Sequence, residues 1–339
     1  MLWAGRFVLR RAALLLPLLL IVAFITFILV RLGGQDPTAM LAGPTATAGE
    51  MARMRSDLGL DQPLIVQFGL WLVRVLHGDL GQSWVTGQPV LTELLGRVVP
   101  TLELLLLGVA LGAAIGLPAG LFSAFHRGGT LDRVVRVASL FGFSIPTYFL
   151  GLAMLLIFFY LLNWAPPGMG RISLMLSPPP TITGSYALDA LLTGNWEAAQ
   201  SAVAQLVLPV ICVAIVAAAP IIKQVRAIVV DVLGADHIRY AHAQGLRPQL
   251  IRRIALRSAA APITTFIGTE LTGLVGTTAL IEYVFAWGGI GQYGLNAIIK
   301  GDFAVVQGYV LLLALFSTLV LLFVDLIVLA MEPRARSTA

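Results

Sequence analysis

The sequence contains very little cysteine and very little charge. A single cysteine, Cys212, occurs among 339 residues, so a disulfide within the chain is impossible and no cysteine-based metal site is indicated. Aspartate, glutamate, lysine and arginine make up 12% of the chain, against about 25% in an average soluble domain. Hydrophobic residues make up 58%, and the mean hydropathy is +0.91. This composition predicts a polytopic membrane protein.

The net charge of +5 leaves two interpretations open. Excess positive charge can mark a nucleic-acid-binding protein, but excess arginine also marks the cytoplasmic loops of a membrane protein. The low charge content and long apolar runs favour the second interpretation. We therefore expect membrane lipid, and no nucleic acid, among the partners of this chain.

Motifs for catalysis, metal binding and nucleotide binding are also missing. The sequence has no GxxxxGK[ST] phosphate loop and no HExxH zinc motif. His237 and His242 are five residues apart and so lie on different faces of a helix, which argues against a metal site. No strand precedes the glycine-rich segment 288–294, which argues against a dinucleotide site. We expect no enzymatic activity, metal or cofactor on this chain.

Six apolar runs are long enough to be membrane-spanning helices. The first follows Arg6, Arg10 and Arg11, and its length exceeds the 7–15 apolar residues of a signal peptide, so it is expected to stay attached. With the N-terminus inside, most of the 22 lysines and arginines fall in inner segments, which satisfies the positive-inside rule. The sequence therefore predicts an all-α protein with both termini in the cytoplasm and spans near residues 12–30, 104–125, 137–162, 202–222, 262–283 and 304–329.

These spans define the expected organisation of the chain. Residues 1–31 form the N-terminal tail and first span, and residues 32–100 form an extracytoplasmic segment in which 62–76 is predicted to be an amphipathic helix. Residues 101–333 form a five-helix core, with an inner loop at 231–258. Residues 334–339 form a cytoplasmic tail.

Two patterns concern the packing of the second and third spans. Gly112, Gly116 and Gly120 recur every four residues, a spacing that lets two helices approach closely, although glycine is also common in membrane helices without this role. Ser144 and Pro146 lie within the third span, where the proline predicts a kink in the bundle interior. We take both residues as candidates for lining a transport pathway.

Ionisable residues within spans are the other candidates for function. Glu270 lies midway along the fifth span, Asp325 near the inner end of the sixth and Glu103 near the outer start of the second. Glu270 could couple transport to protons or sodium, as in a secondary carrier, or it could line a channel or wet cavity. Inverted repeats, which would favour a carrier, are not evident in the sequence.

The longest polar interruption of the second half is residues 231–262. Within it, 236–244 is predicted to be a short helix that ends at Gly245, a residue suited to the position after a helix. Four arginines follow, at 247, 252, 253 and 257. Asp236, Arg239, Tyr240 and Ala243 are spaced to share one helix face.

The segment DHIRYAHAQGL at 236–246, followed by the basic stretch and AAP at 260–262, resembles the EAA loop of ABC importer permeases. His242 and Gln244 depart from the arginine and lysine common there. More narrowly, the whole chain resembles the first permease subunit of the dipeptide, oligopeptide and nickel class. The matching segments are GLDQP 59–63, GDLGQS 78–83, TGQPV 86–90, TLE 101–103, SIP 144–146, FAWGGIG 285–291, DFAVVQG 302–308 and VDL 324–326.

This resemblance implies a type I importer architecture in the bacterial inner membrane. It implies a second homologous permease subunit, two cytoplasmic ABC ATPases that carry ATP and Mg, and an extracytoplasmic substrate-binding protein. The 236–246 helix would be a coupling helix held by an ATPase, and peptide is the expected substrate. The residues expected to serve coupling are Asp236, Arg239, Tyr240, Ala241, Ala243, Gly245 and Leu246.

Overall fold

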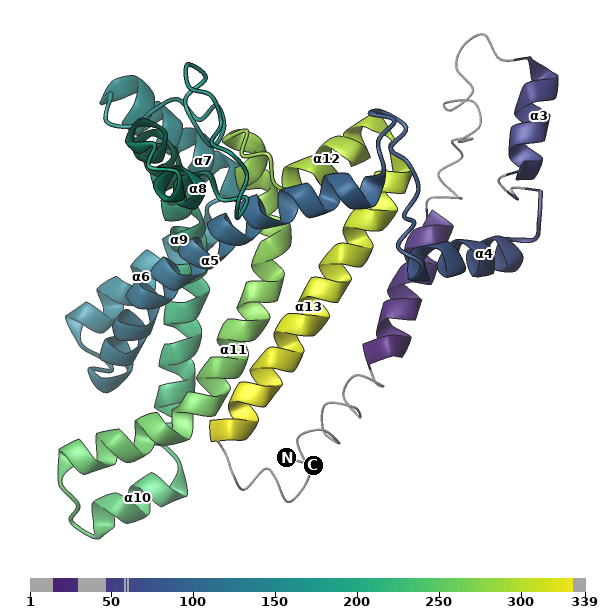
Figure 1. Cartoon of the computed structure of the whole chain (residues 1–339). Coiled ribbons are helices and arrows are strands. Elements are labelled where there is room, and N and C mark those ends of the chain that lie inside the picture. Colours follow the sequence, from purple (N-terminus) through teal and green to yellow (C-terminus); the bar gives the residue numbers. More distant parts are fainter. Residues whose placement is uncertain (1–14, 30–46, 58, 60, 332–339) are drawn as a thin grey trace. The chain divides into compact units, whose positions relative to one another are not determined.

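The computed structural model describes residues 15–29, 47–57, 59 and 61–331 (Figure 1). Regular structure in these residues is helical, apart from an isolated bridge between Gln82 and Pro89. The all-α prediction is therefore confirmed. The helices are Leu15–Leu29, α3 (Ala48–Asp57), α4 (Leu64–Leu76), α5 (Val90–Phe125), α6 (Thr130–Ser144), α7 (Thr147–Met154), the π-helix η1 (Leu155–Leu161), α8 (Tyr186–Leu192), α9 (Trp196–Leu233), α10 (Asp236–Ala243), α11 (Pro248–Val284), α12 (Ile290–Lys300) and α13 (Phe303–Met331).

Three of the described helices, α5, α9 and α13, are long and apolar enough to cross a membrane. The pair α6 and α7–η1 is a fourth candidate if it counts as one broken span. Helix α11 contains the expected fifth span, but Glu270 and the threonines around it lower its hydropathy. The described part of the first expected span is the apolar helix Leu15–Leu29. The count of six spans stays a prediction. Arg6, Arg10, Arg11 and the tail 334–339 lie outside the described residues.

The third expected span is not one kinked helix. Helix α6 begins at Thr130 and ends at Ser144, and α7 begins after Pro146, with 98° between the two axes. Ile145 adopts an extended conformation with φ −76° and ψ 124°. Its backbone is displaced from the helical region because the ring of the following proline clashes with a helical residue before it. The prediction of a kink within one helix was therefore wrong, since the chain breaks and turns here.

A helix begins within the expected outer segment 32–100, whose bounds stay a prediction. Helix α5 begins at Val90, and Pro100 lies within it. The glycine-rich segment 288–294 likewise enters a helix, α12, at Ile290. The predicted amphipathic helix at 62–76 is confirmed as α4, which buries Gln67 and Trp71.

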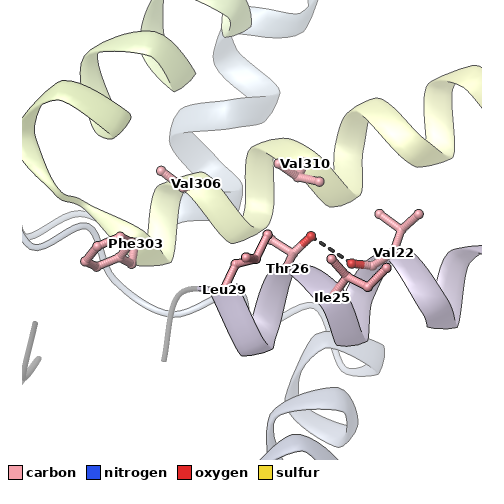
Figure 2. A pocket seen from close by; sticks show the side chains of 7 residues that line it. All are labelled: Val22, Ile25, Thr26, Leu29, Phe303, Val306 and Val310. Carbon is pink, nitrogen blue, oxygen red and sulfur yellow. Dashed lines mark hydrogen bonds between the residues drawn. The ribbon is translucent and has the colours of Figure 1, made fainter. Parts of the chain in front are cut away.

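The chain forms two units: Met1–Val98 with Gln292–Thr318, and Val99–Gly291 with Leu319–Ala339. In the first unit, Phe27 of helix Leu15–Leu29 is fully buried and packs against Trp71 of α4, with 5.6 Å between the ring centroids. An apolar groove of about 410 Å³ lies between helix Leu15–Leu29 and α13 (Figure 2). It is lined by Val22, Ile25, Thr26, Leu29, Phe303, Val306 and Val310. The one hydroxyl in it, that of Thr26, donates to the carbonyl of Val22 at 2.7 Å, so the groove offers no free donor.

In the second unit, α5 and α9 cross with their backbones in close approach. A Cβ atom on Gly112 would lie 2.8 Å from the Cβ of Ala217 and 2.9 Å from the carbonyl oxygen of Ala214. Distances below 3.0 Å also face Gly108, Gly116 and Gly120. Of the two interpretations of this glycine pattern, close helix approach is the correct one. The repeat also includes Gly108, one turn earlier than the sequence pattern suggested, and its partners on α9 are Val213, Ala217, Ile221 and Val225.

Candidate functional site

Helix α10 lies beyond the end of α9 and forms a hairpin with the start of α11 (Figure 1). Ile238 is fully buried and Ala241 is 5% exposed, and both pack against Ile251 and Ala255 of α11. Val232 and Leu233 of α9 complete this small apolar cluster. The cluster fixes α10 against the ends of two long helices, so a force on α10 reaches both.

The end of α10 is a tight helix cap built on Gly245. The amide of Leu246 donates to the carbonyl of Ala241 at 3.3 Å, and the amide of Gly245 donates to the carbonyl of His242 at 3.0 Å. These two bonds are the pair that defines the Schellman motif. Gly245 has φ +69°, a left-handed conformation that a side chain disfavours. The predicted helix end is thus confirmed, with Gln244 as the cap residue.

The face of α10 that the sequence predicted is exposed. Asp236, Arg239, Tyr240 and Ala243 are all exposed, and Tyr240 is exposed by 67%. Asp236 and Arg239 form an ion pair of 2.8 Å on this surface. Ala241 lies on the opposite, buried face, so its position suits packing and not contact with a partner.

Helix α11 presents a second exposed face along its length. The exposed positions are three or four residues apart, which places them on one side of the helix. Glu270 is half-buried beside this face, and Thr269 within it donates to the carbonyl of Thr265 at 3.0 Å. The face consists of Pro262, Thr265, Thr269, Gly273, Gly276, Leu280 and Tyr283.

The remaining pathway candidates lie elsewhere. Ser144 is the last residue of α6 and donates to the carbonyl of Leu140 at 2.8 Å, while Pro146 precedes α7. Both are exposed at the break between these helices. The structure therefore brings together the residues of α10, but Glu270, Ser144 and Pro146 lie on separate elements.

A buried carboxylate that sequence reasoning missed lies near the C-terminal end of α11. Glu282 is fully buried, and its Oε1 accepts a hydrogen bond of 2.6 Å from the hydroxyl of Thr101 on α5. The same hydroxyl accepts a 2.8 Å bond from the amide of Ile290, and the indole of Trp287 donates to the carbonyl of Pro100 at 3.0 Å. These bonds join α5 to the turn after α11. The signal available in the sequence was a glutamate three residues before the first residue of the FAWGGIG segment.

The segment between η1 and α9 is ordered by a second missed carboxylate, Asp189. Its two oxygens accept hydrogen bonds from the amides of Ile182, Thr183 and Gly184, at 2.6 to 3.2 Å. Burial alone would raise the pKa of Asp189, but these bonds and one from the Thr183 hydroxyl outweigh it and lower that pKa below its ordinary value. Glu103 is likewise structural, since it accepts a bond from Ser185 and lies 3.7 Å from Arg171.

The third missed carboxylate is Asp132, which is buried at the start of α6 and forms an ion pair of 2.7 Å with the partly buried Arg226. In the sequence, arginines near span ends indicate only topology, and nothing there links Arg226 to Asp132. Among the described residues, no group of three or more histidine, cysteine, aspartate or glutamate side chains could hold a metal ion.

Comparison with known proteins agrees with these features. The family described as "Binding-protein-dependent transport system inner membrane component" matches residues 116–337, and the N-terminal region of such components matches residues 4–105. The chain is 40% identical over 314 residues to the probable D,D-dipeptide transport system permease protein DdpB of Escherichia coli K12, covering 92% of each. It is 35% identical to the dipeptide transport system permease protein DppB of the same strain, covering 98% of each.

The fold has a solved counterpart. An inward-facing structure of the MetNI methionine ABC transporter matches with a TM-score of 0.51 at 24% identity, covering 70% of this chain and 96% of that one. The match supports the importer-permease architecture, and the relatives confirm the resemblance to the dipeptide class. With matches over nearly its whole length, this chain belongs to the family of inner-membrane components of binding-protein-dependent transport systems.

Proposed function

We propose that this chain is one of two permease subunits of an ATP-driven peptide importer. It forms half of the transport pathway and receives force from a cytoplasmic ABC ATPase through α10. ATP and Mg bind to the ATPase subunits, and an extracytoplasmic binding protein delivers the substrate. The names of the dipeptide permeases DdpB and DppB support di- or oligopeptides as the cargo.

One observation carries the coupling role. Helix α10 uses its apolar side to pack within the hairpin and leaves Asp236, Arg239 and Tyr240 exposed at its surface. A short rigid helix with an exposed polar face is suited to a groove on a partner. Ala243, Gly245 and Leu246 complete this surface and its cap, whereas Ala241 contributes by packing beneath it.

The test is co-purification and transport with the partner subunits. We expect Tyr240→Ala combined with Arg239→Glu to release the ATPase in detergent and to abolish uptake in proteoliposomes, while the permease stays in the membrane. Arg253→Glu is the matched control, since Arg253 is exposed on the neighbouring helix α11. Retention of the ATPase and normal uptake by the double variant would refute the coupling role.

The exposed face of α11 supports a role in the pathway. A helix face of threonine and glycine beside Glu270 is poorly suited to lipid, and ionisable residues in membrane helices usually face a wet cavity or a neighbouring helix. We infer that Thr265, Thr269 and Gly276 line the cavity between the two permeases. Glu270 would then contribute polarity to this cavity, together with Ser144 and Pro146 at the break of the third span.

Cysteine labelling can test this inference because the one native cysteine, Cys212, is buried. Thr269→Cys should react with a membrane-impermeant thiol reagent in the intact complex, and Val275→Cys, at a buried position, should not. Labelling of Thr269→Cys in the isolated subunit but not in the complex would instead make this face a contact with the second permease.

The domain boundaries and topology belong to the same proposal. Residues 1–31 would form the inner tail and first span, 32–100 an outer segment that continues into α5, 101–333 the core with its loop 231–258, and 334–339 the inner tail. A reporter that is active only in the cytoplasm should be silent when fused near Arg171 and active when fused after residue 333.

Peptide uptake by cells that carry or lack the gene tests the substrate. Loss of dipeptide uptake in the deletion strain is expected, and uptake of peptide by this chain alone in liposomes would support the alternative of a secondary carrier or channel that uses Glu270. In that case Glu270→Gln would abolish uptake without any ATPase present.

A further inference from the structure

Asp132 is a buried carboxylate with several hydrogen bonds that the proposed coupling and pathway surfaces leave unused. It lies in the first turn of α6 and is 1% exposed. Its Oδ1 accepts a hydrogen bond of 2.7 Å from Nε of Arg226, and its Oδ2 accepts one of 3.1 Å from a terminal nitrogen of the same guanidinium. Such a two-pronged pair fixes orientation as well as distance.

The other bonds to Asp132 come from a different part of the chain. The hydroxyl of Ser123, near the end of α5, donates to Oδ1 at 2.5 Å, and the amide of Gly128 in the α5–α6 turn donates to Oδ2 at 3.0 Å. Arg136, one turn further along α6, lies 3.6 Å from Oδ1. One buried carboxylate thus joins the end of α5, the turn, the start of α6 and helix α9.

Arg226 lies on the part of α9 that leads to α10. The last residue of α9, Leu233, is seven positions further along the helix, which is about 10 Å. The sequence from Ile221 to Leu233 contains neither proline nor glycine, so this segment can act as a rigid lever. Just before it, Pro220 removes a backbone hydrogen bond within α9 and provides a place to bend.

Helix α5 has the same arrangement. Pro118 lies within α5 before Ser123, and Gly120 is packed tightly on Val225 of α9. Asp132 and the residues bonded to it form what we call the Asp132 cluster: Ser123, Gly128, Asp132, Arg136 and Arg226. In both α5 and α9, the member of this cluster lies after the proline, in the part of the helix nearer to α10. A buried ion pair adds little net stability compared with apolar packing, but it imposes one geometry on the groups it joins.

We propose that Asp132 is a positioning residue that makes the end of α5, the start of α6 and the segment 221–233 of α9 move with α10 as one block. Movement of α10 then reaches the α6–α7 break directly, and not only through α9. This role rests on the proposed docking of α10 to an ATPase.

The test uses the full complex in lipid nanodiscs, with spin labels on Val134→Cys of α6 and His242→Cys of α10, both exposed positions. In the otherwise native subunit, the distance between the labels should be the same without nucleotide and with trapped ATP. In Asp132→Asn and Arg226→Gln the distance should broaden and change on ATP binding. A change of the distance in the native subunit, or an unchanged distance in both variants, would overturn the proposal.

The second readout is the number of ATP molecules hydrolysed for each peptide transported. We expect Asp132→Asn to raise it by roughly 2- to 30-fold, the range found for changes within physical coupling networks. Arg226→Lys, which keeps the charge but loses the two-pronged geometry, should fall between Asp132→Asn and the native subunit. Asp231→Asn, an exposed carboxylate on the same helix, is the control and should leave the ratio unchanged.

These outcomes separate the two proposals. If α10 does not dock to an ATPase, the native subunit itself will lose the ATPase and show no ATP-dependent uptake. If docking is correct but the Asp132 cluster is only structural, the ATPase will bind all variants, and Asp132→Asn will lower stability while leaving the transport ratio at its native value.

Discussion

The contact between α5 and α9 allows a direct prediction for Gly112→Ala. The added Cβ would lie 2.8 Å from the Cβ of Ala217, 2.9 Å from the carbonyl oxygen of Ala214 and 3.2 Å from the amide nitrogen of Ala218. Two of these three atoms belong to the backbone of α9, which no change of rotamer can move. The helices must therefore separate, and overpacking of this kind typically costs about 1–3 kcal/mol.

Gly96→Ala is the matched control for this substitution. Gly96 lies on the same helix, α5, and no described atom is within 4 Å of a Cβ built on it. Both variants gain the higher helix propensity of alanine, worth up to about 1 kcal/mol. The difference between them therefore isolates the contact with α9, and Gly112→Ala should unfold with a free energy lower by about 1–3 kcal/mol than Gly96→Ala.

The measurement is reversible unfolding of the purified subunit by SDS titration in mixed micelles, followed by circular dichroism. Ala217→Gly should rescue Gly112→Ala only in part, because the carbonyl of Ala214 stays 2.9 Å from the new methyl group. Equal stability of Gly112→Ala and Gly96→Ala would refute the close approach of α5 and α9. Full rescue by Ala217→Gly would show that the carbonyl of Ala214 lies further than 2.9 Å from the new methyl group.

Three further predictions concern the cap of α10, the segment before α9 and the C-terminal end of α11. Gly245→Val should weaken ATPase retention, because a left-handed residue with a side chain costs about 1–2 kcal/mol. Gly245→Asn should retain the ATPase, because asparagine tolerates this conformation. Equal retention by both variants would argue against a strained cap. Because the pKa of Asp189 is lowered in the folded state, ionised Asp189 stabilises the fold at pH values above about 4. This stabilisation is lost as the pH falls through the folded-state pKa. Hydrogen exchange at the amides of 182–184 should therefore accelerate in Asp189→Asn at neutral pH, and unchanged protection would contradict this assignment. Thr101→Val removes a donor to the buried Glu282 and an acceptor for Ile290, so it should lower the unfolding free energy by about 1–3 kcal/mol; Thr277→Val, whose hydroxyl faces only its own helix at 3.5 Å, should change it far less.

Much of the candidate coupling site could be predicted because it depends on local rules. The end of α10 follows from a glycine after a short polar helix, and the exposed face follows from the spacing of Asp236, Arg239 and Tyr240. The role of Ala241 could not be predicted in this way. Its burial depends on Ile251 and Ala255 of the next helix, and helical spacing alone does not say which side that helix covers.

The break after Ser144 was predicted in position but not in size. Proline restricts the residue before it, which locates the disturbance at Ile145. Whether the helices on either side stay nearly aligned or turn by 98° depends on their tertiary partners. Gly142 of α6 packs on Ala219 of α9, while Gly151 of α7 packs on Val284 of α11. Both halves contact α9, and the second half is also held by α11.

The sequence by itself determined that this chain is a helical membrane protein without catalytic or nucleotide-binding motifs, because composition and apolar run length are properties of the chain alone. It also determined the family, whose short motifs are distributed over nearly the full length. The tertiary structure decided which charges are structural. Asp132 and Arg226 are 94 positions apart, and Thr101 and Glu282 are 181 apart. Only the folded structure brings such distant groups together. A buried charge without a partner is strongly destabilising, so its partner is set by the packing of the helices and not by the sequence around it.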